Sequence, residues 1–504
     1  MISLMNYLQK WAKLSPHAPF LYEDDSCWSF KAFYEDVLKL GTLLKTKGII
    51  KGDYVLVHVE QKSQHLLAYM ALLNMGAICV HLYPEREHDY IKFAAKHCNA
   101  KAIISSTFKE RLEGCIVINR LDYHEYKALH VKSSDRSEVA YLMFTSGTTS
   151  TPKAVQTTQE NIIFVTRTLI HVAKMQEQKE KEVIFMPLGS TGGLGHFHAC
   201  LMLGNSIRLL PGFYAQMNSD SFERLLDVIE HENITGVLLT PGIILKLLKE
   251  HKTRFSVVGQ RLRYMLANVT PMRREVIVEL LALLPKLHFC TYYGSTEASR
   301  CIVNVCRENV GYEHLTGCAV EGVAIKIDTI NVQGEGEILI KGANVMKGYL
   351  GRGDEGFMEG WFKSGDVGKV HENGLIQVLG RIKDTISIDG LKIFPTELEN
   401  IVLSHAGIKD VGVCSLVDEM SYLQIGLVVV PHHMSDKKQL TQEIYHLLKA
   451  KYKVDETPLY SYKIPKKIYF EETIPRTDLG KVKRDDLAKL LDKNIKPYFI
   501  TLDD

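Results

Sequence analysis

The stretch YLMFTSGTTSTPKAV, residues 141–155, joins an apolar run to a loop rich in hydroxyl groups and glycine. The apolar part, YLMF (141–144), is typical of a buried strand, and Pro152 and Lys153 follow a run of Ser, Thr and Gly. Such a loop can aim backbone N–H groups, hydroxyls and an ammonium at a polyphosphate. The Walker A spacing is absent. Taken alone, the loop is more often a solvated Ser/Thr turn, so its function depends on the rest of the chain.

Helical patterns alternate with short apolar runs on both sides of this stretch. The runs expected to form strands are YVLVHV (54–59), ICVHLY (78–83), KAIISS (101–106), EVIFMP (182–187), SIRLLP (206–211) and GVLLTP (236–241). The pattern around the last three predicts helices over 160–175, over 197–203 and from Ser221. This alternation predicts an α/β fold with mainly parallel strands.

The pattern of apolar residues and glycines changes toward the end of the chain. From Gly334 short strands separated by glycine turns predict a β-rich subregion. After Gly380 a compact tail has its own elements, a helix over 395–403, strands over 411–418, 422–431 and 466–472, and a lysine-rich helix. We therefore expect a large, multi-subdomain N-terminal α/β body and a small C-terminal α+β domain.

Composition excludes several classes of protein. A length of 504 residues predicts two to four domains at roughly 150 residues each, which is too long for a small binding module. The net charge is +2, so no nucleic-acid or anionic membrane partner is indicated. The 10 cysteines include no CxxC pair, which favours a reduced, cytoplasmic protein without structural zinc.

Two apolar segments raise the question of targeting or membrane insertion. Residues 1–14 have helical spacing with interspersed lysines and no long apolar core, so a surface helix is expected and not a signal peptide. Residues 66–80 are uncharged, but Asn74 and Gly76 divide them. A buried helix followed by a buried strand is therefore favoured over a transmembrane segment.

Further motifs follow the phosphate-loop candidate in a fixed order: YYGSTE (292–297), GEILIKGANVMKGYL (336–350), WFKSGDVG (361–368), GRIKDTISIDGLKIFPTELE (380–399) and PRTDLGKVKRDDL (475–487). In this order they resemble the adenylate-forming (ANL) superfamily of acyl-CoA synthetases, luciferases and peptide-synthetase adenylation domains. The resemblance covers nearly the whole chain. It implies an ATP- and acid-binding domain over 1–382 and a mobile C-terminal lid over 383–504, with a hinge near Lys383.

The resemblance implies an enzyme, an AMP-forming acid–thiol ligase that needs ATP and Mg²⁺. The carboxylate and MgATP would form an acyl-adenylate and pyrophosphate, and a thiol, taken as coenzyme A, would then release AMP. Because this chemistry brings anions together, it requires cations and positioning more than a general base. Two alternatives are an acyl carrier protein as thiol donor and a non-catalytic nucleotide-binding relative.

The superfamily's nucleotide-binding residues map onto positions of this sequence. The β- and γ-phosphates would be held by Thr145, Ser146, Gly147, Thr148, Thr149 and Lys153. Tyr293 would stack on adenine, Thr296 would contact the α-phosphate and Glu297 would bind Mg²⁺, which prefers oxygen ligands. Asp366 would accept the ribose hydroxyls, and Arg381 would reach ribose or phosphate. Lys481 would bridge the substrate carboxylate and the α-phosphate, and the residues expected to be catalytic are Thr148, Thr296, Glu297 and Lys481.

The same resemblance places the acid pocket at Gly193, Leu194, His196, Pro241, Gly242, Thr291 and Tyr292. Residues 188–194 contain no acidic side chain, which disfavours an α-amino acid. An aryl acid or a medium-to-long fatty acid fits these positions, with His196 as a packing residue. After rotation of the lid, Gly390 would let a hairpin approach the acyl-adenylate. The particular acid and the oligomeric state are left open.

Four positions depart from the superfamily pattern. Ser150 and Ala154 stand where glycine is usual, and either would be strained at positive φ. Gln159 and Ser190 each replace a frequent histidine. Ser150, Ala154 and Ser190 motivate the non-catalytic alternative. The charged positions of the pattern are nevertheless all present: Lys153, Glu297, Asp366, Arg381, Lys383 and Lys481.

Overall fold

The computed structural model describes residues 3–60, 62–128, 139–145, 152–213, 219–268, 272–329, 334–388, 391–417, 423–432, 436–452, 463–476, 482–491 and 497–499. It divides into two compact units. The first comprises Met1–Val269, Val276–Ile325 and Ile340–Lys363, and the second comprises Thr270–Glu275, Lys326–Leu339 and Ser364–Asp504. The domain boundary expected at 382/383 stays a prediction.

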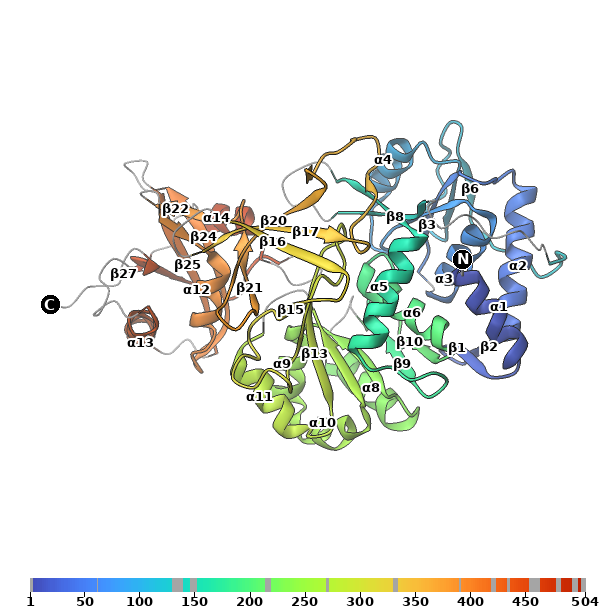
Figure 1. The fold of residues 1–504 in the computed structure, drawn as a ribbon. Helices are drawn as coiled ribbons and strands as arrows, with labels where there is room; N and C mark the ends of the chain where they lie inside the picture. Colours follow the sequence, from blue (N-terminus) through green and yellow to red (C-terminus); the bar gives the residue numbers. More distant parts are fainter. Residues whose placement is uncertain are drawn as a thin grey trace. The chain divides into compact units, whose positions relative to one another are not determined.

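The first unit contains a nine-stranded sheet (Figure 1). Its order is β15 (Cys318–Ala319), β14 (Ile302–Val305), β13 (His288–Tyr293), β12 (Tyr264–Ala267), β11 (Gly236–Leu239), β9 (Lys181–Ile184), β10 (Ser206–Leu209), β1 (Pro19–Glu23) and β2 (Ser26–Ser29). Strands β13 through β1 pair in parallel, and the outer strands pair antiparallel. The helices between these strands are α8 (Ser219–His231), α9 (Pro241–Glu250), α10 (Lys252–Val258) and α11 (Arg274–Leu283), with the short η1 (Gly259–Arg261).

A seven-stranded sheet lies in the same unit. Its order is β18 (Gly348–Tyr349), β8 (Ala154–Thr158), β7 (Val139–Phe144), β4 (Ile78–His81), β3 (Tyr54–His58), β5 (Ala102–Ser105) and β6 (Ile116–Ile118). Strands β7 through β6 are parallel. The helices of this half are α1 (Leu4–Leu14), α2 (Phe30–Thr46), α3 (Lys62–Met75) and α4 (His88–Cys98). Residues 66–80 form the buried end of α3 and the buried β4, as predicted.

Helices α5 (Gln159–Val172) and α6 (Thr191–Leu203) connect the two sheets: α5 contacts β8, α6 contacts β9 and β10, and the two helices pack against each other. Helix α6 begins at Thr191, although the sequence pattern predicts a start near Phe197. Gly192, Gly193 and Gly195 lower the helix propensity of its first turns. Burial of the whole helix, with Ser190 as its N-cap, outweighs that preference.

The β-rich subregion predicted from Gly334 is a five-stranded sheet of β16 (Val323–Thr329), β17 (Gly336–Gly342), β20 (Trp361–Val370) and β19 (Phe357–Met358), with β21 (Ile376–Arg381) also paired to β20. The tail has a hairpin of β22 (Ile386–Ile388) and β23 (Leu391–Ile393) and a sheet of β24 (Ile408–Val417), β25 (Leu423–Pro431), β26 (Lys467–Phe470) and β27 (Tyr498–Phe499). Its helices are α12 (Pro395–Val402), α13 (Lys437–Lys451) and α14 (Arg484–Leu491).

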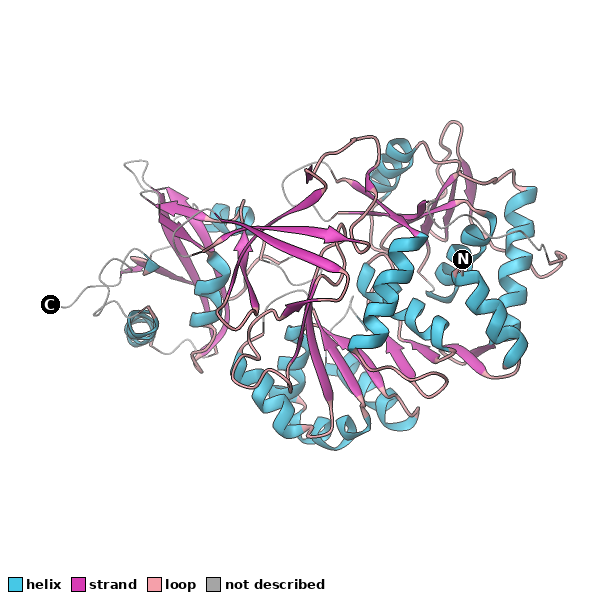
Figure 2. Cartoon of the chain, viewed as in Figure 1, coloured by secondary structure: helices cyan, strands magenta, loops and turns pink. Residues whose placement is uncertain are grey.

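Figure 2 shows helices alternating with strands along the chain, which confirms the predicted α/β class. The elements predicted for the tail are present within a few residues of their expected bounds. Of the helices in the described part of the chain, none combines the length and the apolar character needed to span a bilayer.

Candidate active site

The predicted phosphate loop connects two paired strands. Strands β7 and β8 are antiparallel, and Phe144 lies opposite Ala154 at their ends. The Thr145 N–H donates to the Lys153 carbonyl at 3.0 Å, and the Lys153 N–H donates to Thr145 Oγ1 at 3.3 Å. Thr145 and Lys153 therefore hold the two ends of the loop together. The loop residues themselves, with the predicted Ser146, Gly147, Thr148 and Thr149 and the unusual Ser150, lie outside the described residues.

The ammonium of Lys153 has two neighbours in the first unit. Its Nζ lies 2.7 Å from Oε1 of Glu355 and 4.8 Å from the ring centroid of Tyr349. Arg352 Nη1 lies 3.2 Å from the other carboxylate oxygen of Glu355. Hydrogen bonds from Lys153 and Arg352 hold the pKa of Glu355 below its ordinary value. The Lys153 ammonium is expected to bind phosphate. In this structure it is paired with the carboxylate of Glu355 instead.

The predicted metal ligand, Glu297, shares a neighbour with Lys153. The Tyr349 hydroxyl donates to Glu297 Oε1 at 3.0 Å. The Met346 N–H donates to the Glu297 carbonyl at 2.7 Å, which joins the segment 292–297 to the segment 336–350. Tyr349 therefore connects Lys153, on one side of its ring, with Glu297, at its hydroxyl. Sequence reasoning missed Tyr349, although it lies in the quoted motif GEILIKGANVMKGYL.

Glu297 is suited to holding Mg²⁺. Its carboxylate is half-buried and, within the described ranges, forms no ion pair with a lysine or arginine. A neutral hydroxyl orients the carboxylate and leaves its negative charge available to a hard cation.

Thr145 directly follows β7, and Tyr293 is the last residue of β13. Both therefore lie at the carboxyl end of a parallel strand, where α/β sheets bind their ligands. Tyr293 is half-buried, and Thr296 lies three residues further along the chain. The residues predicted to contact adenine and the α-phosphate, Tyr293 and Thr296, therefore both lie at the carboxyl end of β13. Their roles stay predictions.

The two residues predicted to contact the ribose form an ion pair in the second unit. Asp366 on β20 lies opposite Arg381 on β21, and Arg381 Nε is 2.8 Å from Asp366 Oδ1. Arg381 Nη1 also donates to the Ser364 carbonyl at 3.2 Å. Asp366 is 6% exposed, so the guanidinium compensates the cost of burying its charge. Lys383 is exposed in the turn that follows β21, and Gly390 and Lys481 lie outside the described residues.

The residues predicted for the acid pocket are found on three elements. Gly193, Leu194 and His196 are buried on α6, and His196 Nδ1 pairs with Glu182. The role expected for His196, that of a packing residue, stays a prediction. Pro241 and Gly242 form the first turn of α9.

The other two residues predicted for the acid pocket, Thr291 and Tyr292, are in β13. The Tyr292 hydroxyl accepts a hydrogen bond from Asn268 Nδ2 at 2.7 Å. Burial raises the pKa of Tyr292.

A cavity that is partly open to solvent lies between β7 and β8, the helices α5 and α6, and the segments that follow β13 and β17. Thr296 is the predicted site residue that lines it. Its polar lining includes Tyr141, Thr157, Asn161, Thr191, His198, Ser299, Arg300 and Asn344. Sequence reasoning missed these residues because the resemblance to the superfamily assigns no role to any of their positions. Asn161 fixes one wall, since its Nδ2 donates to the carbonyls of Ala343 and Val345 at 2.9 Å each.

Two of the four unusual residues, Ser190 and Ala154, have a structural explanation. Ser190 caps α6: its hydroxyl donates to the Pro187 carbonyl at 2.7 Å and accepts from the Gly193 N–H at 3.4 Å. Ala154 begins β8 and is not among the residues with positive φ, so the strain considered for it does not arise. Gln159 is buried at the start of α5.

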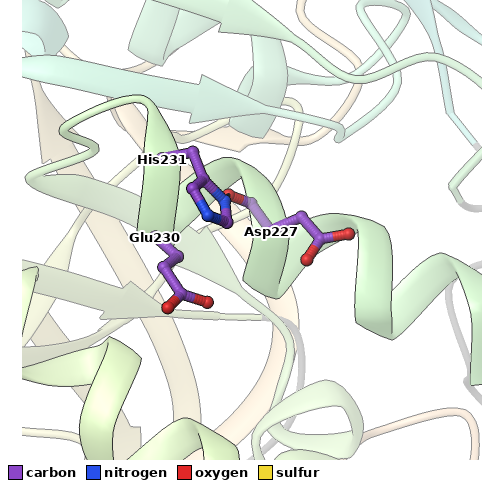
Figure 3. Close-up of side chains that lie close together, drawn as sticks. All are labelled: Asp227, Glu230 and His231. Carbon is purple, nitrogen blue, oxygen red and sulfur yellow. The ribbon is translucent and has the colours of Figure 1, made fainter.

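Asp227, Glu230 and His231 lie close together on α8 (Figure 3). Arg254 forms ion pairs with Asp227 and with Glu230, the latter at 3.0 Å, and His231 Nδ1 bonds the Asp227 carbonyl at 3.0 Å. A guanidinium therefore already balances the carboxylates, and we assign no metal to this cluster.

Comparison with known proteins places these observations in context. A model of the family described as AMP-binding enzyme matches residues 8–350. The 2-succinylbenzoate–CoA ligase of Listeria monocytogenes is 26% identical and aligns over 96% of this chain and 99% of its own length. The o-succinylbenzoate CoA synthetase of Bacillus subtilis, solved with its acyl-adenylate, has a TM-score of 0.82, 22% identity, and coverage of 98% of this chain and 99% of its own. ATP-bound MatB from Rhodopseudomonas palustris has a TM-score of 0.83, 20% identity, and coverage of 98% and 100%.

Proposed function

Because this chain belongs to the AMP-binding enzyme family, we propose that its site joins a carboxylic acid to the α-phosphate of ATP and then passes the acyl group to coenzyme A. The family and the CoA-ligase relatives confirm the predicted enzyme class, an AMP-forming acid–CoA ligase. The use of ATP and Mg²⁺ is supported by the Bacillus subtilis o-succinylbenzoate CoA synthetase, which has been solved with ATP and magnesium ion. The residue roles below are our proposal.

The observation that carries the proposal is the contact of Tyr349 with both Lys153 and Glu297. A cation suited to phosphate and a carboxylate suited to a metal ion meet around one side chain, although they come from distant parts of the sequence. This pairing matches a reaction in which the negative charge of a triphosphate must be neutralised from two sides.

In the first step an oxygen of the acid attacks the α-phosphorus, and the bond from this phosphorus to the bridging oxygen breaks, releasing pyrophosphate. Lys153 exchanges Glu355 for a phosphate oxygen, with Thr145, Ser146, Gly147, Thr148 and Thr149 completing the phosphate site. Glu297 would hold Mg²⁺, whose charge would favour departure of pyrophosphate. Thr296 lines the cavity, so a phosphate bound there faces an acid inside it. Lys481 orients the attacking carboxylate.

Asp366 and Arg381, in the second unit, are the residues proposed to recognise the ribose. Asp366 accepts the ribose hydroxyls, and its ion pair with Arg381 offsets the cost of burying the carboxylate. The second step is attack of a thiol on the acyl carbon, which releases AMP. We propose that the lid, residues 383–504, turns about Lys383 between the two steps, and that Gly390 then approaches the acyl-adenylate.

The acid is proposed to be an aryl or fatty acid, and the relatives named for 2-succinylbenzoate make that aryl keto acid the first to test. A carrier-protein thiol is the second candidate acceptor. We also propose a cytoplasmic location, because the 10 cysteines are free thiols, as expected in a reducing compartment.

The test is pyrophosphate release from MgATP over a panel of acids, with and without coenzyme A. We expect release that requires an acid, and formation of acyl-CoA and AMP when CoA is added. Lys153→Met should raise the KM for ATP, whereas Lys347→Met, which removes an exposed ammonium in the motif 336–350, should not. If no acid causes release of pyrophosphate, the proposed reaction is wrong. If a carrier protein accepts the acyl group and CoA does not, the proposed acceptor is wrong.

A further inference from the structure

Arg300 is a buried cation in the wall of the cavity. It lies beyond the motif YYGSTE, is 2% exposed, and lines the cavity with Thr296 and Ser299. Its backbone has φ +49°, the left-handed region that long side chains rarely adopt. Backbone strain of this kind is concentrated at binding and catalytic sites.

The guanidinium of Arg300 has unmet hydrogen-bonding capacity. Its Nε and Nη2 are buried and have no hydrogen-bond partner, and over the described ranges no carboxylate forms an ion pair with it. The Tyr292 ring lies 5.2 Å from Cζ, and the Tyr292 side chain also forms a hydrogen bond with Arg300. The buried carboxylate of Glu182 is bound instead by His196, Cys200 and Tyr264. An arginine does not deprotonate, so its buried charge favours binding of an anion.

The other cavity-lining side chains carry no negative charge. His198, which also lines the cavity, is neutral, because burial and then the charge of Arg300 lower its pKa to about 3. The described wall is therefore singly positive, and Arg300 is the source of that charge. A ligand carrying an anionic group would balance it.

Room for the guanidinium is provided by α6. A Cβ at Gly195 would lie 2.7 Å from Nη1 and Nη2 of Arg300, so any side chain there would displace the arginine. Gly195 also lines the cavity. Glycine lowers helix propensity, so its presence in the middle of α6 needs a reason. The guanidinium of Arg300, which occupies the space that a side chain would need, is that reason.

The reacting carboxylate is a poor partner for this charge. It loses its negative charge when the acyl-adenylate forms, which would leave Arg300 unpaired through the second step. A second carboxylate on the same acid stays ionised through both steps.

We propose that Arg300 binds a second carboxylate of a dicarboxylic acid, whose other carboxylate is adenylated near Thr296. This inference rests on the proposed function, since it assumes that the cavity holds the acid. Arg300 is then the residue that selects dianionic over monoanionic acids.

The experiment compares pairs of acids that differ by one carboxylate: octanoate with octanedioate, and 4-oxo-4-phenylbutanoate with its ring-carboxylated analogue. For at least one pair, kcat/KM for the diacid should exceed that for the monoacid. Arg300→Gln should remove at least about tenfold of this preference, mainly through KM, with the KM for ATP unchanged. Arg300→Lys should keep part of the preference because it keeps the charge.

Calorimetric titration of each acid alone separates this inference from the proposed function. Diacid binding should weaken at least about tenfold in Arg300→Gln and in Gly195→Ala even if turnover is absent. Removing an unpaired buried charge should not lower the thermal midpoint of Arg300→Gln. Equal loss for monoacids and diacids, a raised KM for ATP, or no diacid preference in the unmodified protein would overturn the proposal.

Discussion

Lys153 and Glu355 form an ion pair at the end of the predicted phosphate loop, with 2.7 Å between Nζ and Oε1. Exposed pairs of this kind contribute little to stability, so phosphate can replace the carboxylate. Glu355→Gln should lower the KM for ATP by about two- to fivefold, because ATP no longer competes with Glu355 for Lys153. Steady-state kinetics measures this, and Glu372→Gln, which removes an exposed carboxylate elsewhere, should leave the KM unchanged. A raised KM would instead assign Glu355 to nucleotide binding.

Glu297 and Tyr349 are expected to act together on the metal ion. Glu297→Gln keeps the side-chain volume but removes the charge, so activity should fall by about a hundredfold or more while the protein stays folded. Tyr349→Phe removes the hydroxyl that orients Glu297, and the magnesium concentration for half-maximal activity should rise by about tenfold. Magnesium titration of pyrophosphate release measures both. An unchanged magnesium dependence in Glu297→Gln would exclude this carboxylate from the metal site.

Asp366 is predicted to recognise the ribose. The unmodified enzyme should use 2′-deoxy-ATP at least about tenfold less efficiently than ATP, because a charge-assisted hydrogen bond is lost. Asp366→Asn should weaken binding of both nucleotides and reduce the difference between them. A full preference for ATP in Asp366→Asn would contradict the assignment.

Lys481 is predicted to serve the first step and not the second. Lys481→Ala should abolish pyrophosphate release and leave attack of coenzyme A on a supplied acyl-adenylate close to normal, because lid rotation would remove Lys481 from the site. The two half-reactions are measured separately. Equal loss of both would argue against a lid that works in two positions.

Lys62 makes stability depend on pH. Its ammonium donates to the carbonyls of Phe185 and Met186, at 2.6 and 3.1 Å, and burial lowers its pKa to about 7. The unfolded chain, in which this pKa is near 10.5, binds more protons between pH 7 and 10, so the Lys62 contribution to stability rises with pH over that range. In Lys62→Met the rise in urea midpoint from pH 7 to 9 should be smaller. A rise equal to that of Lys347→Met, the exposed control, would show that Lys62 does not titrate there.

Local patterns predicted most of the elements near the site. The change from helix to strand at Gly76 was expected, although Asn74 lies within α3, and the apolar run 141–144 was expected as the strand that leads to the phosphate loop. No strand was predicted over β8 or β13. The start of α6 was missed because its glycines disfavour a helix, and the reason for Gly195, the proximity of Arg300, comes from a segment more than a hundred residues away. Propensity is a property of neighbours in sequence, whereas this contact depends on tertiary packing.

The sequence by itself determined the reaction class, because the order and residue types of the motifs from 141–155 to 475–487 reflect the charges that a triphosphate and a carboxylate require. Only the tertiary structure decided that Tyr349 connects Lys153 with Glu297, and that Arg300 is buried in the cavity wall and forms no ion pair with a carboxylate of the described residues. A motif specifies which groups are present. Whether a charge is paired or burial has left it unpaired depends on every chain segment packed around it, and that is settled only when the chain has folded.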